Sequence, residues 1–223
     1  MQFLYHPDAG LPDITVEGEA YRYLFKVRRH KEGERVALRN LTDDYLCFYR
    51  IERVTRREAV LVFLEKEERI VMPERTLHLG WCVVDPKTVE KTLPALNELG
   101  VAKISFVYCD RSQKNFRLDF ERMKRILINS SQQCGRSRLM EMERFEDLES
   151  YFAAYPQSAV LDFGGSKLSC ADELRSVVVG CEGGFSEEER KRFEKKSILS
   201  FDTPLVLRSE SAAAAVAASR LTR

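Results

Sequence analysis

Residues 177–189 read VVVGCEGGFSEEE, and this stretch decides the fold class. The three valines predict a buried strand, and the glycines after them predict a turn. Ser186 and Glu189 have the spacing of a capping box, so a helix is expected to follow. A strand that runs through a glycine turn into a helix is the unit of α/β sheets. Ligands of such sheets bind beyond the carboxyl ends of the strands, so this loop is also a candidate binding site, a capped turn without a ligand being the alternative.

The rest of the C-terminal part follows the same alternation of strand and helix. This pattern predicts a largely parallel α/β sheet with helices on both faces. The expected strands are residues 77–84, 103–108, 158–163, 177–180 and 198–201. The expected helices are residues 88–99, 119–134, 187–195 and 210–221.

The N-terminal part has a different pattern. Short alternating or apolar runs at 35–39, 45–51 and 59–64 are separated by charged, turn-like residues, and a helical stretch is expected near 16–27. These runs predict a small β-barrel or sandwich. Residues 65–75 (EKEERIVMPER) are polar and end in a proline-bearing connection. The boundary is therefore placed there, with residues 1–70 as a β domain and residues 71–223 as the α/β domain.

The composition limits the class of protein. The chain has 223 residues, of which 44% are hydrophobic and 32% charged, as in globular rather than disordered proteins. No run approaches the roughly 18 apolar residues of a transmembrane helix, and the first residues lack a signal-peptide pattern, so we expect a cytoplasmic protein without a membrane partner. The six cysteines are scattered singly and the three histidines are far apart, so neither a metal site nor a disulfide framework is expected.

Two stretches are strongly basic although the net charge is only +1. Residues 22–39 carry seven basic and two acidic side chains, a net charge of +5, and residues 111–138 carry eight and two, a net charge of +6. Residues 139–173 compensate with a net charge of −6. Charge alone favours two solvated helix faces, although the excess of arginine over lysine in both basic stretches points toward phosphate recognition.

Two further loops follow predicted strands. Residues 204–211 (PLVLRSES) precede an alanine-rich helix, with Ser209 as the expected N-cap and Glu210 in the first turn, where the helix dipole favours an acid. Arg208 stands just before the helix, and packing alone does not explain it. Residues 159–165 (AVLDFGG) form a strand that ends in two glycines.

Several segments together resemble a known family. They are CEGGFSEEE (181–189), VLRSESAAAAVAA (206–218), NELGVAKI (97–104), the Arg111-Ser112 pair and QQCGRSR (132–138). The chain resembles, over nearly its whole length, the ribosomal RNA small subunit methyltransferase E family, which are 16S rRNA uridine N3-methyltransferases of the SPOUT superfamily. The family pattern of the glycine loop is G-P-E-G-G-[FL]-S-x-x-E, and Cys181 replaces its proline.

The resemblance implies an architecture and a cofactor. The implied C-terminal part, residues 71–223, is a SPOUT domain with a parallel sheet and a deep trefoil knot, and residues 1–70 form a PUA-like β-barrel that helps to bind RNA. The implied enzyme is a homodimer whose active site lies between protomers. The three loops would bind S-adenosylmethionine, mostly through main-chain groups and apolar walls. The expected cofactor-binding residues are Leu161, Val179, Gly180, Glu182, Gly183, Leu205, Leu207 and Ser209.

The resemblance also implies roles in catalysis and RNA binding. Methylation of uridine N3 requires an exposed base, loss of the N3 proton and alignment with the methyl group. Arg208, which is nearest to the cofactor loops, is the expected residue that stabilises the N3 anion, with Arg111 and Arg136 as the other candidates. Glu210 is the expected base, with Glu182 as the other candidate and first-turn capping as the structural alternative for Glu210. The expected RNA-binding residues are Arg22, Lys26, Arg28, Arg29, Arg111 and Arg136.

Three rival hypotheses differ in their ligands. The first is a SPOUT methyltransferase that acts on another RNA, such as tRNA. The second is a non-catalytic ribosome-assembly or RNA-binding factor that keeps the fold, and cofactor binding separates it from an enzyme. The third is a nucleotide-binding α/β protein, which competition between S-adenosylmethionine and ATP separates from the other two.

Overall fold

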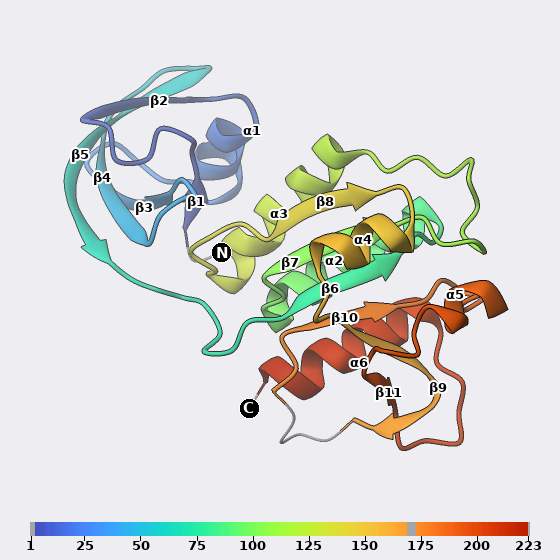
Figure 1. Cartoon of the computed structure of the whole chain (residues 1–223). Coiled ribbons are helices and arrows are strands. Elements are labelled where there is room, and N and C mark those ends of the chain that lie inside the picture. Colours follow the sequence, from blue (N-terminus) through green and yellow to red (C-terminus); the bar gives the residue numbers. More distant parts are fainter. Residues whose placement is uncertain (1–2, 169–172, 223) are drawn as a thin grey trace. The chain divides into compact units, whose positions relative to one another are not determined.

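The structure is a computed structural model, and it describes residues 3–168 and 173–222 (Figure 1). The chain forms two compact units. Unit 1 contains residues 1–72 and 128–139, and unit 2 contains residues 73–127 and 140–223. Cys170 lies outside the described residues.

Unit 1 is built on a curled five-stranded sheet with the order β1-β3-β4-β5-β2. The strands are β1 (Leu4–Tyr5), β2 (Asp13–Glu17), β3 (Arg35–Arg39), β4 (Tyr45–Val54) and β5 (Glu58–Glu68). β1 pairs with β3 in parallel, and the other pairs are antiparallel. Register shifts interrupt the long β4–β5 ladder at two places, and such irregularities bend and twist a strand.

The helical stretch of unit 1 begins later than expected. Helix α1 covers Gly18–Tyr21, and the π-helical turn η1 covers Arg22–Val27. The prediction of helix from residue 16 was wrong, because Val16 belongs to β2 and pairs with Ala59. DITVE alternates buried and exposed residues with a period of two, which is the pattern of a half-buried strand.

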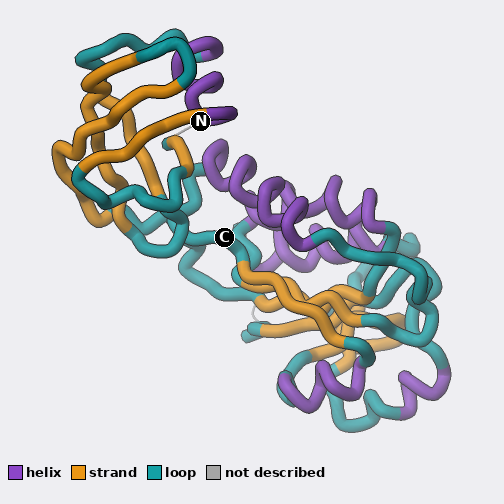
Figure 2. Tube along the Cα trace, turned by 90° about the horizontal axis from the view of Figure 1, so that it is seen from above, coloured by secondary structure: helices purple, strands orange, loops and turns teal. Residues whose placement is uncertain are grey.

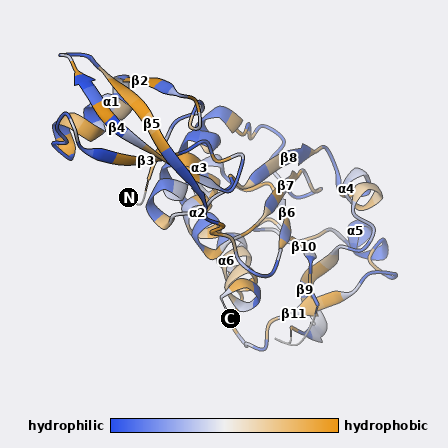
Figure 3. Cartoon of the chain, turned by 90° about the vertical axis from the view of Figure 1, so that its left-hand side faces the viewer, coloured by the Kyte–Doolittle hydropathy of each residue, from blue (hydrophilic) through white to orange (hydrophobic). Residues whose placement is uncertain are grey.

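The core of unit 1 lies on one face of its sheet. Its fully buried residues include Val16, Leu38, Tyr49, Ile51 and Leu61. β5 changes from apolar to charged along its length, as Figure 3 shows, so only its first half contributes to this core. A small second cluster of Phe3, Leu41 and Leu46 packs against Ile128 and Leu139.

Unit 2 contains a six-stranded, entirely parallel sheet with the order β11-β9-β10-β6-β7-β8. The strands are β6 (His78–Cys82), β7 (Lys103–Val107), β8 (Glu141–Phe145), β9 (Ala159–Lys167), β10 (Ser176–Val179) and β11 (Ile198–Ser200). The predicted α/β class with a parallel sheet is confirmed. β8 was not predicted, because EMERF is half-exposed at the sheet edge and has no apolar run.

The helices of unit 2 are α2 (Pro86–Leu99), α3 (Phe120–Cys134), α4 (Leu148–Ala154), α5 (Glu187–Lys191) and α6 (Ser209–Leu221), and the second half of α3 clusters with unit 1. Neighbouring residues of β6 show that helices cover both faces of the sheet. A side chain at Gly80 would meet the ring of Tyr151 in α4 at 2.6 Å, whereas the next residue, Trp81, bonds Ser209 of α6. Successive strand residues point to opposite faces, so α4 and α6 lie on opposite sides (Figure 2).

Within residues 3–168 and 173–222, no helix is long and apolar enough to cross a membrane. Over the same residues, no group of three His, Cys, Asp or Glu side chains is arranged to hold a metal ion.

Candidate functional site

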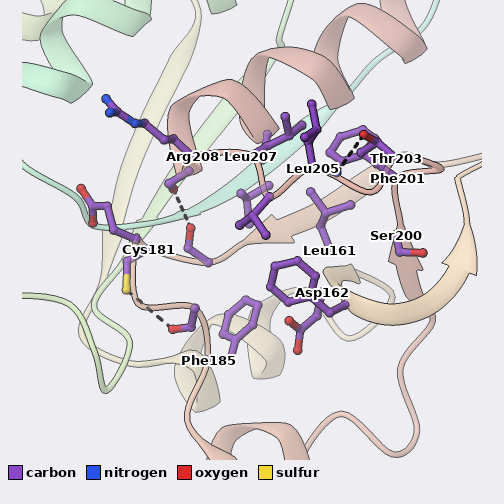
Figure 4. A pocket seen from close by; sticks show the side chains of 18 of the residues that line it. Leu161, Asp162, Cys181, Phe185, Ser200, Phe201, Thr203, Leu205, Leu207 and Arg208 are labelled. Atoms are coloured by element: carbon purple, nitrogen blue, oxygen red, sulfur yellow. Dashed lines mark hydrogen bonds between the residues drawn. The ribbon is translucent and has the colours of Figure 1, made fainter.

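A pocket of about 370 Å³ lies in unit 2 along the middle of β9 and beyond the carboxyl end of β10 (Figure 4). It is formed by residues 161–164 of β9 and by the loops after β10 and β11, which belong to the three segments that the sequence singles out. The prediction of a strand end at the two glycines was wrong, because β9 runs through Gly164 and Gly165 to Lys167. The volume lies within the ordinary range of small-molecule sites. The lining residues are Leu161, Asp162, Phe163, Gly164, Val179, Gly180, Cys181, Glu182, Gly184, Phe185, Ser200, Phe201, Thr203, Leu205, Val206, Leu207, Arg208, Ser209 and Ala212.

Much of the pocket wall is apolar. Leu161 and Phe185 point into it in Figure 4, and Phe185 is buried beneath the glycine loop. Three apolar side chains at the pocket are unusually exposed: Phe163 at 69%, Leu205 at 71% and Val206 at 77%. Exposed apolar residues gathered at one site mark a surface that covers a ligand or a partner.

Ser209 ties the last helix to the glycine loop. The prediction that Ser209 is the N-cap was wrong, because α6 begins at Ser209 and Arg208 holds the cap position. The buried Ser209 hydroxyl donates to the carbonyl oxygen of Gly180 at 2.5 Å and accepts from the indole Nε1 of Trp81 at 2.8 Å. Three elements far apart in sequence are therefore joined at one oxygen atom.

The glycine loop is also fastened to the loop after β7. The capping box is present, since Ser186 accepts from the Glu189 amide and Glu189 accepts from the Ser186 amide. The other oxygen of buried Glu189 accepts from the Asp110 amide at 2.8 Å, and burial raises the pKa of this carboxyl. Arg111 donates to the Gly183 carbonyl at 2.6 Å. Both loops therefore share one hydrogen-bonded framework.

Asp162, which lines the pocket, forms an ion pair with Arg190. Arg190 binds both carboxylate oxygens of Asp162, at 2.7 and 3.1 Å. The Asp162 side chain is only 8% exposed, and its hydrogen bond raises the pKa of Arg190. A bidentate bond of this kind holds both partners in one orientation, so it links the first half of β9 to α5.

Most of the predicted cofactor-binding residues line this pocket. One of them, Gly183, and the predicted catalytic residue Glu210 do not. Leu161, Val179, Gly180, Glu182, Leu205, Leu207 and Ser209 line it, whereas Gly183 does not, because Arg111 covers it. Arg208 lies at the pocket, but its exposed guanidinium points away from the apolar walls in Figure 4. Glu210 is half-buried in the first turn of α6 and is not among the lining residues.

The predicted RNA-binding residues lie at three places in the structure. Arg22, Lys26, Arg28 and Arg29 are exposed on η1 and the residues after it. Arg28 bonds the hydroxyl of Tyr23, and Arg29 has a positive φ of 61°, which is uncommon outside glycine. Arg111 holds the glycine loop in unit 2.

Arg136 differs from the other predicted RNA-binding residues because only 3% of it is exposed. Its Nε donates to the Arg138 carbonyl, and burial lowers its pKa to about 10. In this chain Arg136 therefore does not present its charge to solvent.

The sequence reasoning missed several residues of the site. Phe201 and Thr203 line the pocket, yet neither belongs to a motif that the sequence singles out. Phe185 lies in the glycine-loop motif, and Asp162 carries a weaker signal, a carboxylate inside an apolar strand just before two glycines. Cys181, at the family's proline position, also lines the pocket.

The fold and the site together define the class of protein. A parallel α/β unit with its pocket at the carboxyl edge accompanies a small β unit, and residues 72–221 match the family model of the RNA methyltransferase domain. Residues 16–64 match the RNA methyltransferase PUA domain. The class is therefore that of the two-domain RNA methyltransferases.

The curated relatives identify the family. Ribosomal RNA small subunit methyltransferase E of Helicobacter pylori strain J99 is 42% identical over 221 residues, which cover 97% of this chain and 98% of that protein. The same enzyme of Aquifex aeolicus is 29% identical and covers 91% of each chain. The chain belongs to the ribosomal RNA small subunit methyltransferase E family.

Solved structures share the fold. A methyltransferase of Legionella pneumophila in complex with SAM superposes with a TM-score of 0.82 at 24% identity, covering 97% of this chain and 95% of that chain. Ribosomal RNA small subunit methyltransferase E of Neisseria gonorrhoeae, bound to S-adenosyl methionine, has a TM-score of 0.80 at 19% identity, covering 98% and 96%.

Proposed function

We propose that this protein transfers a methyl group from S-adenosylmethionine to N3 of a uridine in 16S rRNA of the small ribosomal subunit. The observation that carries the proposal is the pocket along β9 and beyond β10, where the family's glycine loop and its V-L-R-x-E segment meet. Membership of the methyltransferase E family supports the RNA class, and two solved structures that share the fold, one of them named methyltransferase E, contain this cofactor.

The chemistry of the pocket fits the cofactor. S-adenosylmethionine combines a flat base with a cationic sulfonium and a charged amino group. The apolar walls of Leu161, Val179 and Phe185 suit the base, and the carboxylate of Glu182 suits the positive charges. Aromatic rings also attract cations, so Phe185 and Phe201 add to this preference. When bound, the cofactor supplies the electrophilic methyl group.

The chain's own residues then have three tasks. The loops held by Ser209 and Arg111 keep the pocket in shape, so the reactants are aligned at little entropic cost. Arg208, at the pocket, stabilises the negative charge that develops on the uracil as N3 loses its proton. Glu210, two residues further along the chain, accepts that proton. Glu210 does not line the pocket of this single chain, so this role requires the substrate or a second protomer to complete the site.

The remaining parts of the proposal concern assembly. The β unit, residues 1–70, binds RNA through Arg22, Lys26, Arg28 and Arg29, and residues 71–223 form the methyltransferase domain. The enzyme is a homodimer, and the exposed Phe163, Leu205 and Val206 at the pocket support a covering partner. The last segment of the chain passes through a trefoil knot, as in the SPOUT superfamily. The protein acts in the cytoplasm, on the assembled subunit or its RNA.

A methyl-transfer assay tests the proposal. Labelled S-adenosylmethionine is incubated with the protein and with unmethylated small subunits, naked 16S rRNA or tRNA, and the product nucleoside is identified by mass spectrometry. We expect 3-methyluridine in the subunits or their rRNA. A product in tRNA would favour a different RNA substrate, and cofactor binding without transfer would do the same. If the protein neither binds the cofactor nor transfers a methyl group, the hypothesis of an enzyme is contradicted. The hypothesis of an RNA-binding factor then remains.

A further inference from the structure

Three cysteines that are scattered in the sequence meet beneath the glycine loop. Cys82 ends β6, Cys109 follows β7, and Cys181 follows β10, and β6 lies between the other two strands in the sheet. All three are buried and none is in a disulfide. Parallel strands bring their carboxyl ends to one edge, so the topology itself gathers these thiols.

Cys109 and Cys181 are the adjacent pair. Their sulfur atoms lie 3.5 Å apart, within hydrogen-bonding distance. The Cys181 sulfur also lies 3.7 Å from the Gly184 carbonyl oxygen, a contact drawn in Figure 4. The Cys109 sulfur lies 3.2 Å from the Ser112 hydroxyl, which is anchored to the Val83 carbonyl. Cys109 is thus fixed from behind, whereas Cys181 sits on a glycine-rich loop.

The two thiols differ in access and in acidity. Cys181 lines the pocket, whereas Cys109 lies behind it and is only 2% exposed. Hydrogen bonds from Cys181 and Cys82 lower the pKa of Cys109, and the bond to Cys109 raises the pKa of Cys181. The shared hydrogen bond therefore makes Cys109 the more acidic of the two thiols, and the thiolate is the reactive form of cysteine.

We propose that Cys109 and Cys181 are an oxidation site, at which a peroxide that enters the pocket converts the two thiols into an intramolecular disulfide. The Cys181 sulfur, with its proton passed to the Cys109 thiolate, attacks one peroxide oxygen. The O–O bond breaks, Cys181 becomes a sulfenic acid, and the departing hydroxide takes the proton from Cys109 and leaves as water. The Cys109 sulfur, again a thiolate, then attacks the Cys181 sulfur. The S–S bond forms, the S–O bond breaks, and the departing hydroxide takes a proton to leave as a second water. Two thiols are oxidised by two electrons, and one peroxide is reduced to two waters.

Closing this disulfide changes the pocket. The sulfurs must approach from 3.5 Å to about 2.05 Å, the length of a disulfide bond. Because Cys109 is anchored by Ser112, the movement falls on Cys181 and on the adjoining Gly180, Gly183 and Gly184. This loop lines the pocket, so oxidation lowers affinity for the cofactor, a consequence that rests on the proposed function. A bound cofactor would in turn shield Cys181 from the oxidant.

Peptide mapping tests the pair directly. The full-length protein is treated with hydrogen peroxide, the remaining thiols are blocked, and the protein is digested and analysed by mass spectrometry without reduction. We expect a cross-linked peptide pair containing Cys109 and Cys181, which dithiothreitol removes. The Cys134→Ser variant, whose half-buried thiol lies on α3, should form the same cross-link. A map in which Cys181 is oxidised only to sulfinic acid, or in which neither thiol reacts, would overturn the proposal.

Binding measurements test the consequence. Calorimetry with S-adenosylmethionine should show at least tenfold weaker binding after peroxide treatment, with recovery in dithiothreitol. In Cys109→Ser the cross-link and the dithiothreitol-reversible part of the loss should both be absent. A cross-linked protein that binds the cofactor as tightly as the reduced one would refute the effect on the pocket. Failure of the reduced protein to bind would instead contradict the proposed function, while the peptide map would still decide whether the pair is oxidised.

Discussion

The hydroxyl of Ser209 and the carbonyl oxygen of Gly180 are joined by a 2.5 Å hydrogen bond that fastens the start of α6 to the glycine loop. The same hydroxyl accepts from the fully buried Trp81. Ser209→Ala leaves a buried indole donor and a carbonyl acceptor without this partner, which costs about 1–3 kcal/mol.

Chemical denaturation of Ser209→Ala should show this loss, and cofactor affinity should fall with it. Ser219→Ala is the matched control, because its hydroxyl bonds only the Val216 carbonyl within the same helix. If both variants lose stability equally, the hydrogen bond to Gly180 has no special role.

Arg190→Ala should lower the free energy of unfolding of the protein. The substitution leaves Asp162, 8% exposed, without its two-pronged partner, and an unpaired buried carboxylate is strongly unfavourable. Because Arg190 itself is 41% exposed, we expect the lower part of the range for broken buried pairs, about 1–3 kcal/mol.

Arg192→Ala provides the comparison, since Arg192 and Glu149 are both well exposed and 3.4 Å apart. Its free energy of unfolding should change by less than about 0.5 kcal/mol. If Arg192→Ala loses as much stability as Arg190→Ala, the loss comes from the removal of any positive charge on this helix region and not from the Asp162–Arg190 pair.

Protonation of His78 should lower the free energy of unfolding as the pH falls from about 6.5 to about 4. Burial, reinforced by the charge of Lys103, lowers the pKa of His78 to about 4, against about 6.5 in an unfolded chain. Between these values the unfolded state binds more protons, so stability rises with pH across this window and is complete above it. Full separation of the two values corresponds to about 3 kcal/mol.

The measurement is the difference in unfolding free energy between the wild type and His78→Gln at pH 4 to 7. Glu143 and Lys103, which face the same cluster, remain in both proteins, so their titration largely cancels. If the difference in unfolding free energy is constant from pH 4 to 7, His78 is not the group responsible for the loss of stability.

Arg208→Ala and Glu210→Gln test the proposed chemistry. Arg208→Ala should reduce kcat by about 10²–10³-fold, the effect of removing one donor that stabilises a transition-state anion. Its melting temperature should hardly change, because Arg208 is exposed. Glu210→Gln should lower kcat if Glu210 is the base.

Glu187→Gln is the control for Glu210→Gln, since it removes a first-turn acid from α5 outside the pocket. Full activity in Glu210→Gln, with an unchanged pH profile, would leave Glu210 as a helix-stabilising acid only.

The basic turn of unit 1 should contribute to RNA affinity through charge. Arg22 and Lys26 are both exposed on η1. Replacing both by glutamine should weaken binding to rRNA and lower the slope of log K against log salt by about two, one for each lost phosphate contact. The variant Arg56→Gln/Arg57→Gln, in the exposed β4–β5 turn, removes the same charge elsewhere on the unit. Equal slopes in the two variants would indicate a diffuse charge effect.

Local sequence was sufficient for much of the architecture. The expected strand at 103–108 and the helix at 119–134 agree with β7 and α3 within one residue, because buried apolar runs and helical periodicity are local signals. The same reasoning missed β8 and α4. β8 is a half-exposed edge strand, and α4 has only seven residues, so neither carries a long periodic pattern.

By itself the sequence determined the α/β class, the three segments that meet at the pocket and the family, because these depend on residue types at short spacing. Only the tertiary structure decided how distant residues meet. It moved Ser209 from a capping role to the bond with Gly180, buried Arg136, and paired Asp162 with Arg190. It also placed Cys109 within 3.5 Å of Cys181, 72 residues away in the chain. Such pairs depend on strand order in a parallel sheet, which brings separate strand ends together and which no local pattern encodes.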